Sequence, residues 1–165
     1  MSPAVEFVAL SDGQIRSRFD RLLRHLDHWG DVVATDAGRL EDRRMLEFAV
    51  VSPGGDLDVE TRELFREYYQ RNRAGVWDIV KYTYEYLDVV RGVRLAFHVH
   101  DLGGRRRVAH AHCEESFDIP EDERSAHFRA VEYDLREAHD VFMRHYAAGI
   151  APDCSTFLPL AVNRE

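Results

Sequence analysis

The stretches Val80-Lys-Tyr-Thr-Tyr-Glu-Tyr86 and Val93-Arg-Leu-Ala-Phe-His-Val-His-Asp101 decide the fold, because both alternate between two kinds of side chain. In the first, tyrosines alternate with charged or polar residues, and in the second, apolar residues alternate with arginine, alanine and histidine. Such a period of two residues is typical of a half-buried strand. Gly103-Gly104 then predicts a hairpin turn, with Arg106 to Cys113 as the return strand. We therefore predict a three-stranded meander.

Two helices and two further strands are expected before this meander. Ala4 to Leu10 and Met45 to Ser52 have the composition of strands. Between them, Ser11-Asp-Gly-Gln14 has the form of a capping box, and helical spacing of apolar residues runs from there until Gly30. A second helix is expected between the turn at residues 51–56 and residues 72–75. Its apolar stripe would be formed by Leu64, Phe65, Tyr68 and Tyr69.

The last third of the chain predicts one long helix. Asp118 would cap it, Pro120 suits its first turn, and Gly149 would end it. The histidines of this helix and of the first helix are expected to be ordinary surface residues. Residues 150–165 are expected to be irregular.

The predicted architecture is α+β. It is an antiparallel or mixed sheet with a three-stranded meander, packed by two N-terminal helices and a long C-terminal helix. Residues 1–149 are expected to form one domain, with a weak subdivision near residue 75, and residues 150–165 an irregular C-terminal tail.

The composition limits the function classes. The chain has 165 residues, 45% of them hydrophobic, and a formal net charge of −8. This charge argues against a protein that coats nucleic acid through its overall field, although it leaves room for a local basic patch. No apolar run approaches the roughly 20 residues that span a bilayer, so no membrane association is expected.

The compartment is predicted from the N-terminus and the cysteines. The first residues lack the basic-then-apolar layout of a signal peptide. Cys113 and Cys154 are far apart and match no zinc or redox spacing. We therefore expect a cytoplasmic protein with reduced thiols.

Four of the nine histidines lie within fifteen residues of each other, as two His-x-His pairs on the predicted hairpin. His98 and His100 form one pair, and His110 and His112 the other; both rings of a pair share a face. A two-residue turn would put the pairs on opposite faces of the sheet. A three-residue turn, Gly103 to Arg105, would put His98 opposite His110 and cluster all four rings as ligands for zinc or iron. The sequence leaves both registers open.

The arginine run beside the second pair suggests a different chemistry. Arg105, Arg106 and Arg107 precede His110 and His112, and arginine binds phosphate oxygens while imidazole transfers protons near neutral pH. This set predicts RNA cleavage without a metal cofactor. Arg107 would act with the histidines, and Arg105 and Arg106 would bind the substrate. Further candidates are Asp101, which would orient an imidazole or bind a metal ion, and Tyr84, which would stack on a base.

The chain resembles the TumE-type toxin family between residues 76 and 146. The resemblance rests on Tyr82-Thr-Tyr-Glu-Tyr86, Arg94-Leu-Ala-Phe97, His100-Asp101 and His110-Ala-His112, followed by acidic residues and a C-terminal helix. It implies a toxin acting on RNA, paired with an antitoxin protein, with Asp101, His110 and His112 in its site. The sequence departs from the family in the linker between Asp101 and His110, and residues 1–75 have no counterpart in the family.

Three hypotheses follow from these patterns. The first is a toxin-like endoribonuclease that cleaves RNA by metal-independent acid–base chemistry, with RNA and an antitoxin as partners. The second is a metalloprotein that holds zinc or iron with its four clustered histidines. The third is a non-catalytic protein-interaction module.

Overall fold

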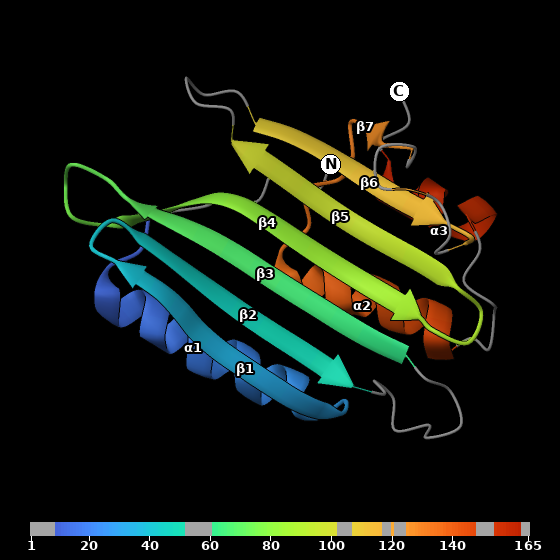
Figure 1. The fold of residues 1–165 in the computed structure, drawn as a ribbon, viewed down its shortest axis with the longest axis horizontal. Helices are drawn as coiled ribbons and strands as arrows, with labels where there is room; N and C mark the ends of the chain where they lie inside the picture. The colour runs from blue at the N-terminus through green and yellow to red at the C-terminus, as the bar shows by residue number, and fades with distance from the viewer. Residues whose placement is uncertain are drawn as a thin grey trace.

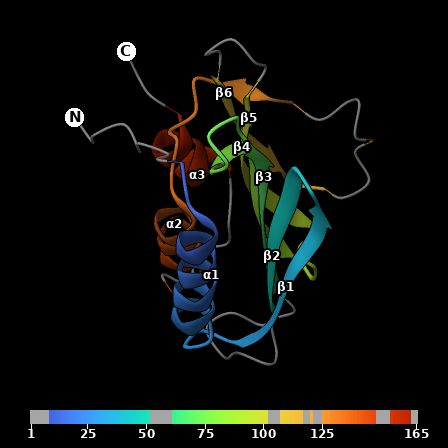
Figure 2. The same ribbon diagram turned by 90° about the vertical axis from the view of Figure 1, so that its left-hand side faces the viewer.

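The computed structural model describes residues 9–51, 61–101, 107–116, 120, 125–147 and 154–162. Its elements, in chain order, are α1 (Asp12–Leu26), β1 (Asp31–Leu40), β2 (Arg43–Val51), β3 (Thr61–Arg71), β4 (Trp77–Asp88), β5 (Val93–Asp101), β6 (Arg107–Glu114), β7 (His127–Phe128), α2 (Leu135–Ala147) and α3 (Cys154–Ala161). The seven strands form one antiparallel sheet in the order of the chain. The three helices lie behind the sheet in Figure 1, and the turned view confirms that all of them cover the same face (Figure 2).

The α+β class and the antiparallel β4–β5–β6 meander agree with the sequence analysis, but the expected architecture is wrong. The described part of the chain has one N-terminal helix, and the sheet is a seven-stranded meander. The predicted second helix is strand β3. It pairs with β2 from Arg62 to Gln70 and with β4 from Thr61 to Arg71.

The misleading feature of β3 is its buried acids. The strand buries Glu63, Phe65, Glu67 and Tyr69 on its helix-covered face. Because acids occupy two of these positions, the apolar residues alone do not alternate along the strand. Leu64 and Tyr68, on the other face, complete a false helical stripe. Pairing with two neighbouring strands overrides that local pattern.

The C-terminal third also differs from the prediction. The helix expected from residue 118 begins at Leu135, after the short strand β7 and after Arg129, whose φ of 61° lies outside the helical region. Asp134 caps it instead: its carboxylate accepts from the Glu137 N–H, and the Glu137 carboxylate accepts from the Asp134 N–H. Asp118 and Gly149 lie outside the described residues. The tail expected to be irregular contains α3.

Helix α1 begins as predicted. The Ser11 hydroxyl and the Gln14 side chain each accept from the other's backbone N–H, which completes the capping box. The helix ends at Leu26, four residues before Gly30. The strand expected before it lies largely outside the described residues, but Leu10 forms a bridge with Trp77.

The core lies between the sheet and the helices, and aromatic rings dominate it. The tyrosines of β4 point into it: the rings of Tyr82 and Tyr84 stack with centroids 4.2 Å apart, and Tyr86 lies against Phe142 of α2. Phe97 of β5 also stacks on Phe142, with centroids 5.6 Å apart. The tyrosine stretch that predicted a strand therefore supplies the middle of the core.

A buried carboxylate joins α1 to the middle of the sheet. Glu67 is fully buried, and Arg18 of α1 donates to both of its oxygens, at 2.9 and 2.5 Å. The hydroxyls of Tyr69 and Tyr84 donate to the same carboxylate. Burial alone would raise the pKa of Glu67, but Arg18 and the two hydroxyls together lower it below its ordinary value. The carboxylate is therefore ionised inside the core.

A second buried pair docks α2. Nδ1 of His139 lies 2.9 Å from both carboxylate oxygens of Glu63, and both side chains are fully buried. Burial raises the pKa of Glu63, although His139 opposes that shift. His139 was expected on the helix surface, and that expectation is wrong.

A disulfide joins Cys113 of β6 to Cys154, the first residue of α3. It fixes α3 beside the edge of the sheet and contradicts the expectation of reduced thiols. Separately, no described helix is both long enough and apolar enough to cross a bilayer.

Replacing Arg18 by methionine should destabilise the protein by about 3–5 kcal/mol at neutral pH, because Glu67 then remains buried without its counter-charge. Urea denaturation followed by circular dichroism measures this free energy of unfolding. Arg16→Met, on the exposed side of the same helix, should change it by about 0.5 kcal/mol or less. The double variant Arg18→Met/Glu67→Gln should recover part of the loss. An equal loss of stability in Arg18→Met and Arg16→Met would contradict the role given to Glu67.

The disulfide should appear in the intact mass of the purified protein as a loss of two hydrogens, restored by reduction of the unfolded chain. Because the bond closes a loop of 41 residues, Cys154→Ser should lower the free energy of unfolding by about 2–4 kcal/mol. Two free thiols in freshly purified protein, titrated under denaturing conditions without reductant, would show that the bond does not form.

Candidate metal centre

The four histidines of the hairpin share the face of the sheet that no described helix covers. In the β5–β6 register, His98 lies directly opposite His110, and Asp101 lies opposite Arg107. Directly opposed residues project to the same face, and so do residues two apart on one strand. This is the register that the three-residue turn predicted, although residues 102–106 themselves lie outside the described part.

Three of these histidines converge. The ring centroids are 5.1 Å apart for His98 and His110, and 4.9 Å apart for His98 and His112 and for His110 and His112. One nitrogen from each ring lies within 4.8 Å of the others. His100 lies at the side of the group, with its ring stacked on that of His110 at 5.2 Å.

Two carboxylates support this trio from the same face. Glu85 of β4 has an oxygen 3.3 Å from Nε2 of His98, and Glu114 of β6 has one 3.3 Å from Nδ1 of His112. Arg94 joins the two acids, since its guanidinium contacts Glu85 and lies 3.1 Å from Glu114. The acids are therefore held at fixed positions beside two of the three rings.

The environment favours the uncharged form of His98, His100 and His110. Burial, followed by the neighbouring histidines, lowers the pKa of His110 to about 4. Burial also lowers the pKa of His98 despite the opposing effect of Glu85, and burial together with Lys81 lowers that of His100. A neutral imidazole is the form that binds a metal ion.

The trio fits a transition-metal ion. Nδ1 of His110 is buried, with no hydrogen-bond partner among the described residues, so a metal ion would satisfy it. Ligand nitrogens around tetrahedral zinc lie about 3.3 Å apart, given Zn–N distances near 2.0–2.1 Å. Nitrogens within 4.8 Å of one another need only small ring rotations to reach that spacing. The carboxylates at His98 and His112 match the acids that orient metal-bound histidines.

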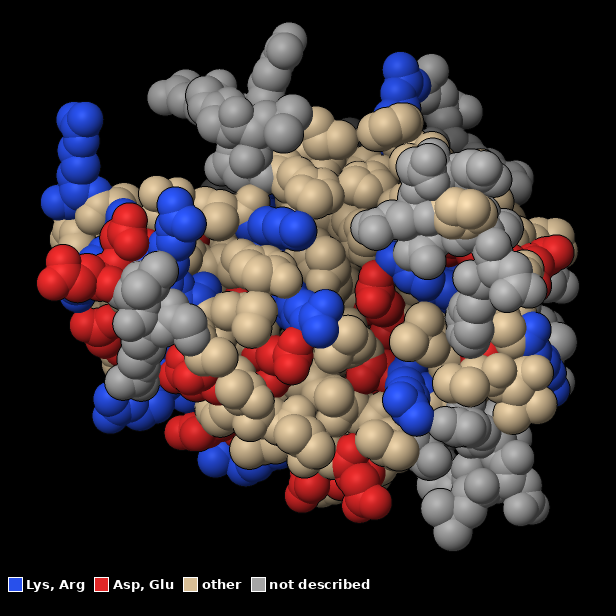
Figure 3. Space-filling view, in the orientation of Figure 1, with Lys and Arg blue, Asp and Glu red and all other residues tan. Residues whose placement is uncertain are grey.

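The surroundings of the trio are polar and of mixed charge. Figure 3 shows the same face as Figure 1, with acidic and basic side chains interspersed among uncharged ones. Phe128 of β7 is 63% exposed, and its ring lies 6.0 Å from that of His110. The trio is half-buried, so it lies at the surface within reach of a ligand.

Of the other predicted site residues, Arg107 and Tyr84 do not join the histidines. Arg107 alternates with the histidines along β6 and lies 4.0 Å from Glu132 on the helix-covered face. Tyr84 is buried in the core, and its hydroxyl donates a hydrogen bond to the Glu67 carboxylate. Asp101 is the last residue of β5, opposite Arg107. Arg105 and Arg106 lie outside the described residues.

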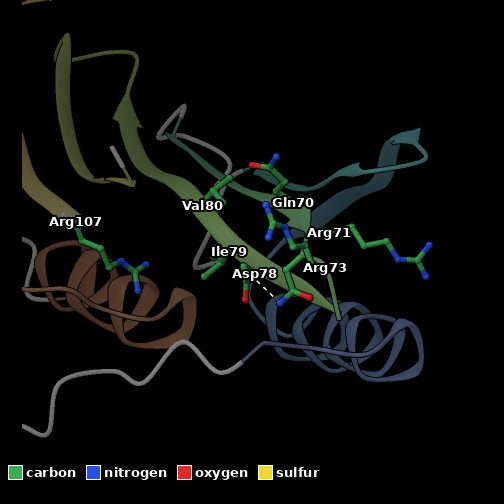
Figure 4. Close-up of a pocket in the computed structure, with 8 residues that line it drawn as sticks. Gln70, Arg71, Arg73, Asp78, Ile79, Val80 and Arg107 are labelled. Carbon is green, nitrogen blue, oxygen red and sulfur yellow. Dashed lines mark hydrogen bonds between the residues drawn. The ribbon is translucent and has the colours of Figure 1, made fainter. Parts of the chain in front are cut away.

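A cavity of about 490 Å³ lies at the β3–β4 turn, away from the histidine trio. Its lining includes three arginines, Arg71, Arg73 and Arg107. Arg71 and Arg73 come from the β3 end of this turn, whereas Arg107 comes from β6, and the side chain of Arg73 points away from the others (Figure 4). Arg71 also donates a hydrogen bond to the Gly75 carbonyl and forms an ion pair with Asp12. The three guanidinium groups therefore do not converge on a common ligand position.

The residues that the sequence analysis missed are Glu85, Arg94 and Glu114. Glu85 and Arg94 occupy the polar positions of the two alternating stretches, so their face was predictable. Their contact depends on the pairing of β4 with β5 and of β5 with β6, which places Glu85 opposite Ala96 and Arg94 opposite Glu114. No local sequence pattern indicates the registers in which these strands pair.

The pKa of His110 predicts how stability changes with pH. Because the folded value is about 4 and the ordinary value is 6.5, the unfolded chain binds this proton more readily between those limits. Metal-free protein should therefore become less stable as the pH falls from 7 to 5, and His110 should account for about 1–2 kcal/mol of that loss. His110→Gln should lose correspondingly less, as measured by urea denaturation in chelator at both pH values. His28→Gln, at an exposed position in the turn after α1, is the control. An identical pH dependence in His110→Gln and wild type would refute the prediction.

Comparisons with protein-family models, with curated proteins and with solved structures found no match to this chain.

Proposed function

We propose that this protein is a metalloprotein that binds one first-row transition-metal ion through His98, His110 and His112. The observation that carries the proposal is the convergence of these three rings, with one nitrogen of each within 4.8 Å of the others. The low pKa values of His98 and His110 support it, since these two ligands have no proton to release near neutral pH. The buried, unpartnered Nδ1 of His110 supports it independently.

The ligand set favours zinc over iron. Non-haem iron sites of the facial type use two histidines and a carboxylate, whereas three histidines are a known set for catalytic zinc. Glu85 and Glu114 are held by Arg94, so they are better placed to orient His98 and His112 than to bind the ion themselves.

Three protein ligands leave a coordination position open, as in catalytic rather than structural zinc sites. A bound zinc ion would supply Lewis-acid chemistry there, and the protein would hold it on an exposed sheet face that a small ligand can reach. We therefore propose a catalytic or ligand-binding metal centre in preference to a structural one.

RNA cleavage by a TumE-type toxin with an antitoxin partner stays a prediction. It relies on arginines beside His110 and His112, and Arg107 lies on the opposite face of the sheet from them. Growth inhibition on expression that persists in the presence of chelator, and is lost in His110→Ala, would favour this chemistry over the metal centre.

Protein purified without a histidine tag and dialysed after exposure to zinc should retain about one equivalent per chain by elemental analysis. His110→Gln should weaken zinc binding more than about 100-fold, because it removes a ligand, whereas Glu85→Gln should weaken it about 10–100-fold, because it removes only the group that orients His98. A competition titration with a chromophoric chelator measures both affinities.

His28→Gln provides the matched control, since it removes an exposed histidine, in the turn after α1, that is remote from the trio in sequence. It should keep the wild-type affinity. Less than a tenth of an equivalent of zinc, cobalt or iron in the loaded wild type would exclude the metal centre.

A further inference from the structure

The cations on the histidine face differ in how they are neutralised. Arg94 lies between the carboxylates of Glu85 and Glu114, and Arg66 forms an ion pair with Glu47 at 2.5 Å. Lys81, the only lysine in the sequence, has no ion-pair partner among the described residues; its ammonium group lies 5.1 Å from the ring centroid of Tyr68. Among the cations that β4, β5 and β6 place on this face, Lys81 is therefore the one that is available to an incoming anion.

Lys81 lies next to the histidine trio. It is directly opposite His100 in the β4–β5 register, while Thr83 is directly opposite His98. Lys81 is thus a diagonal neighbour of His98, at a backbone separation of about 7–8 Å on one face of the sheet. A lysine stem is long and flexible, so its ammonium group can reach a ligand bound above the trio. Its charge already affects His100, whose pKa it helps to lower.

With a metal ion bound, the site would carry an excess of positive charge, which favours the binding of an anion. Arg94 and its two acids together carry one negative charge, and imidazoles that bind a metal ion are neutral. A divalent ion and Lys81 would therefore leave a net charge of two positives at the surface around the open coordination position. An anionic oxygen there would bind the metal directly and accept a charge-assisted hydrogen bond from the ammonium group. The ring of His100, beside the trio, carries an N–H that can donate a second hydrogen bond.

We propose that the metal centre binds a small oxyanion, a phosphate or carboxylate group, in its open coordination position, and that Lys81 neutralises that group. The proposal rests on the proposed function, because the anion binds to the metal held by His98, His110 and His112. It makes Lys81 a substrate-binding residue and defines the substrate class as a molecule with an exposed phosphate or carboxylate.

The test uses full-length protein loaded with cobalt(II), whose visible spectrum reports the ligands of the ion. Inorganic phosphate and acetate are titrated separately, at constant ionic strength. At least one of them should change the spectrum with a saturable dissociation constant. Preference for phosphate would identify a phosphate ester as the substrate, and preference for acetate would identify a carboxylate.

Lys81→Met should bind cobalt as wild type does but raise the dissociation constant of the preferred anion at least tenfold. Lys81→Arg, which keeps the charge, should restore most of the affinity. Arg66→Met is the matched control, because it removes a cation of the same face that is already paired with Glu47, and it should leave anion binding unchanged.

Two results would overturn the inference while leaving the metal centre intact. One is a cobalt spectrum that neither anion changes. The other is an equal dissociation constant in wild type and Lys81→Met. Failure of the wild type to bind cobalt would refute the proposed function and the anion site together.

Discussion

The ionised carboxylate of Glu67, buried in the middle of the sheet, is the constraint on which the rest of the structure depends. An unpaired charge there would cost several kcal/mol, so the chain folds only in an arrangement that brings Arg18 to it. That arrangement places α1 across β3, with the hydroxyls of Tyr69 and Tyr84 completing the carboxylate's hydrogen bonds. Compared with an apolar core, such a pair adds little net stability, but it specifies where the helix docks.

The same strand docks the second helix by the same means. Glu63, four residues before Glu67 and on the same face of β3, receives His139 of α2. Both of these polar contacts hold the helices on one side of the sheet. The other side is left to side chains that need no helix above them, and the histidine trio forms there. Glu63 and Glu67, the two acids that interrupt the apolar alternation of β3, thus determine which face of the sheet is left free for the histidine trio.

Core packing also fixes the geometry of the trio. Phe97 and Ala111 face each other on the core side of β5 and β6, and this pairing places His98 opposite His110 on the other side. A shift of one residue would bury imidazoles beside Phe142 and expose apolar side chains, so the register is strongly specified. Rigid strands hold all three histidines and both supporting acids, so the pairing of the strands sets the geometry of the trio.

The sequence by itself determined the features that depend on neighbouring residues. These are the capping box that starts α1, the strands β2, β4, β5 and β6 with their two-residue period, and the two His-x-His pairs, each on one face of its strand. Each is set by backbone geometry within a few residues. Only the tertiary structure decided that residues 61–71 form a strand, because acids stand at its core positions and their partners, Arg18 and His139, come from distant helices. It also decided the register of the hairpin and the position of Arg107 on the other face of the sheet from the histidines. The contact of Glu85, Arg94 and Glu114 with the trio was decided in the same way. These depend on which strands pair and in which register, and that is settled by burial and hydrogen bonding across the whole sheet.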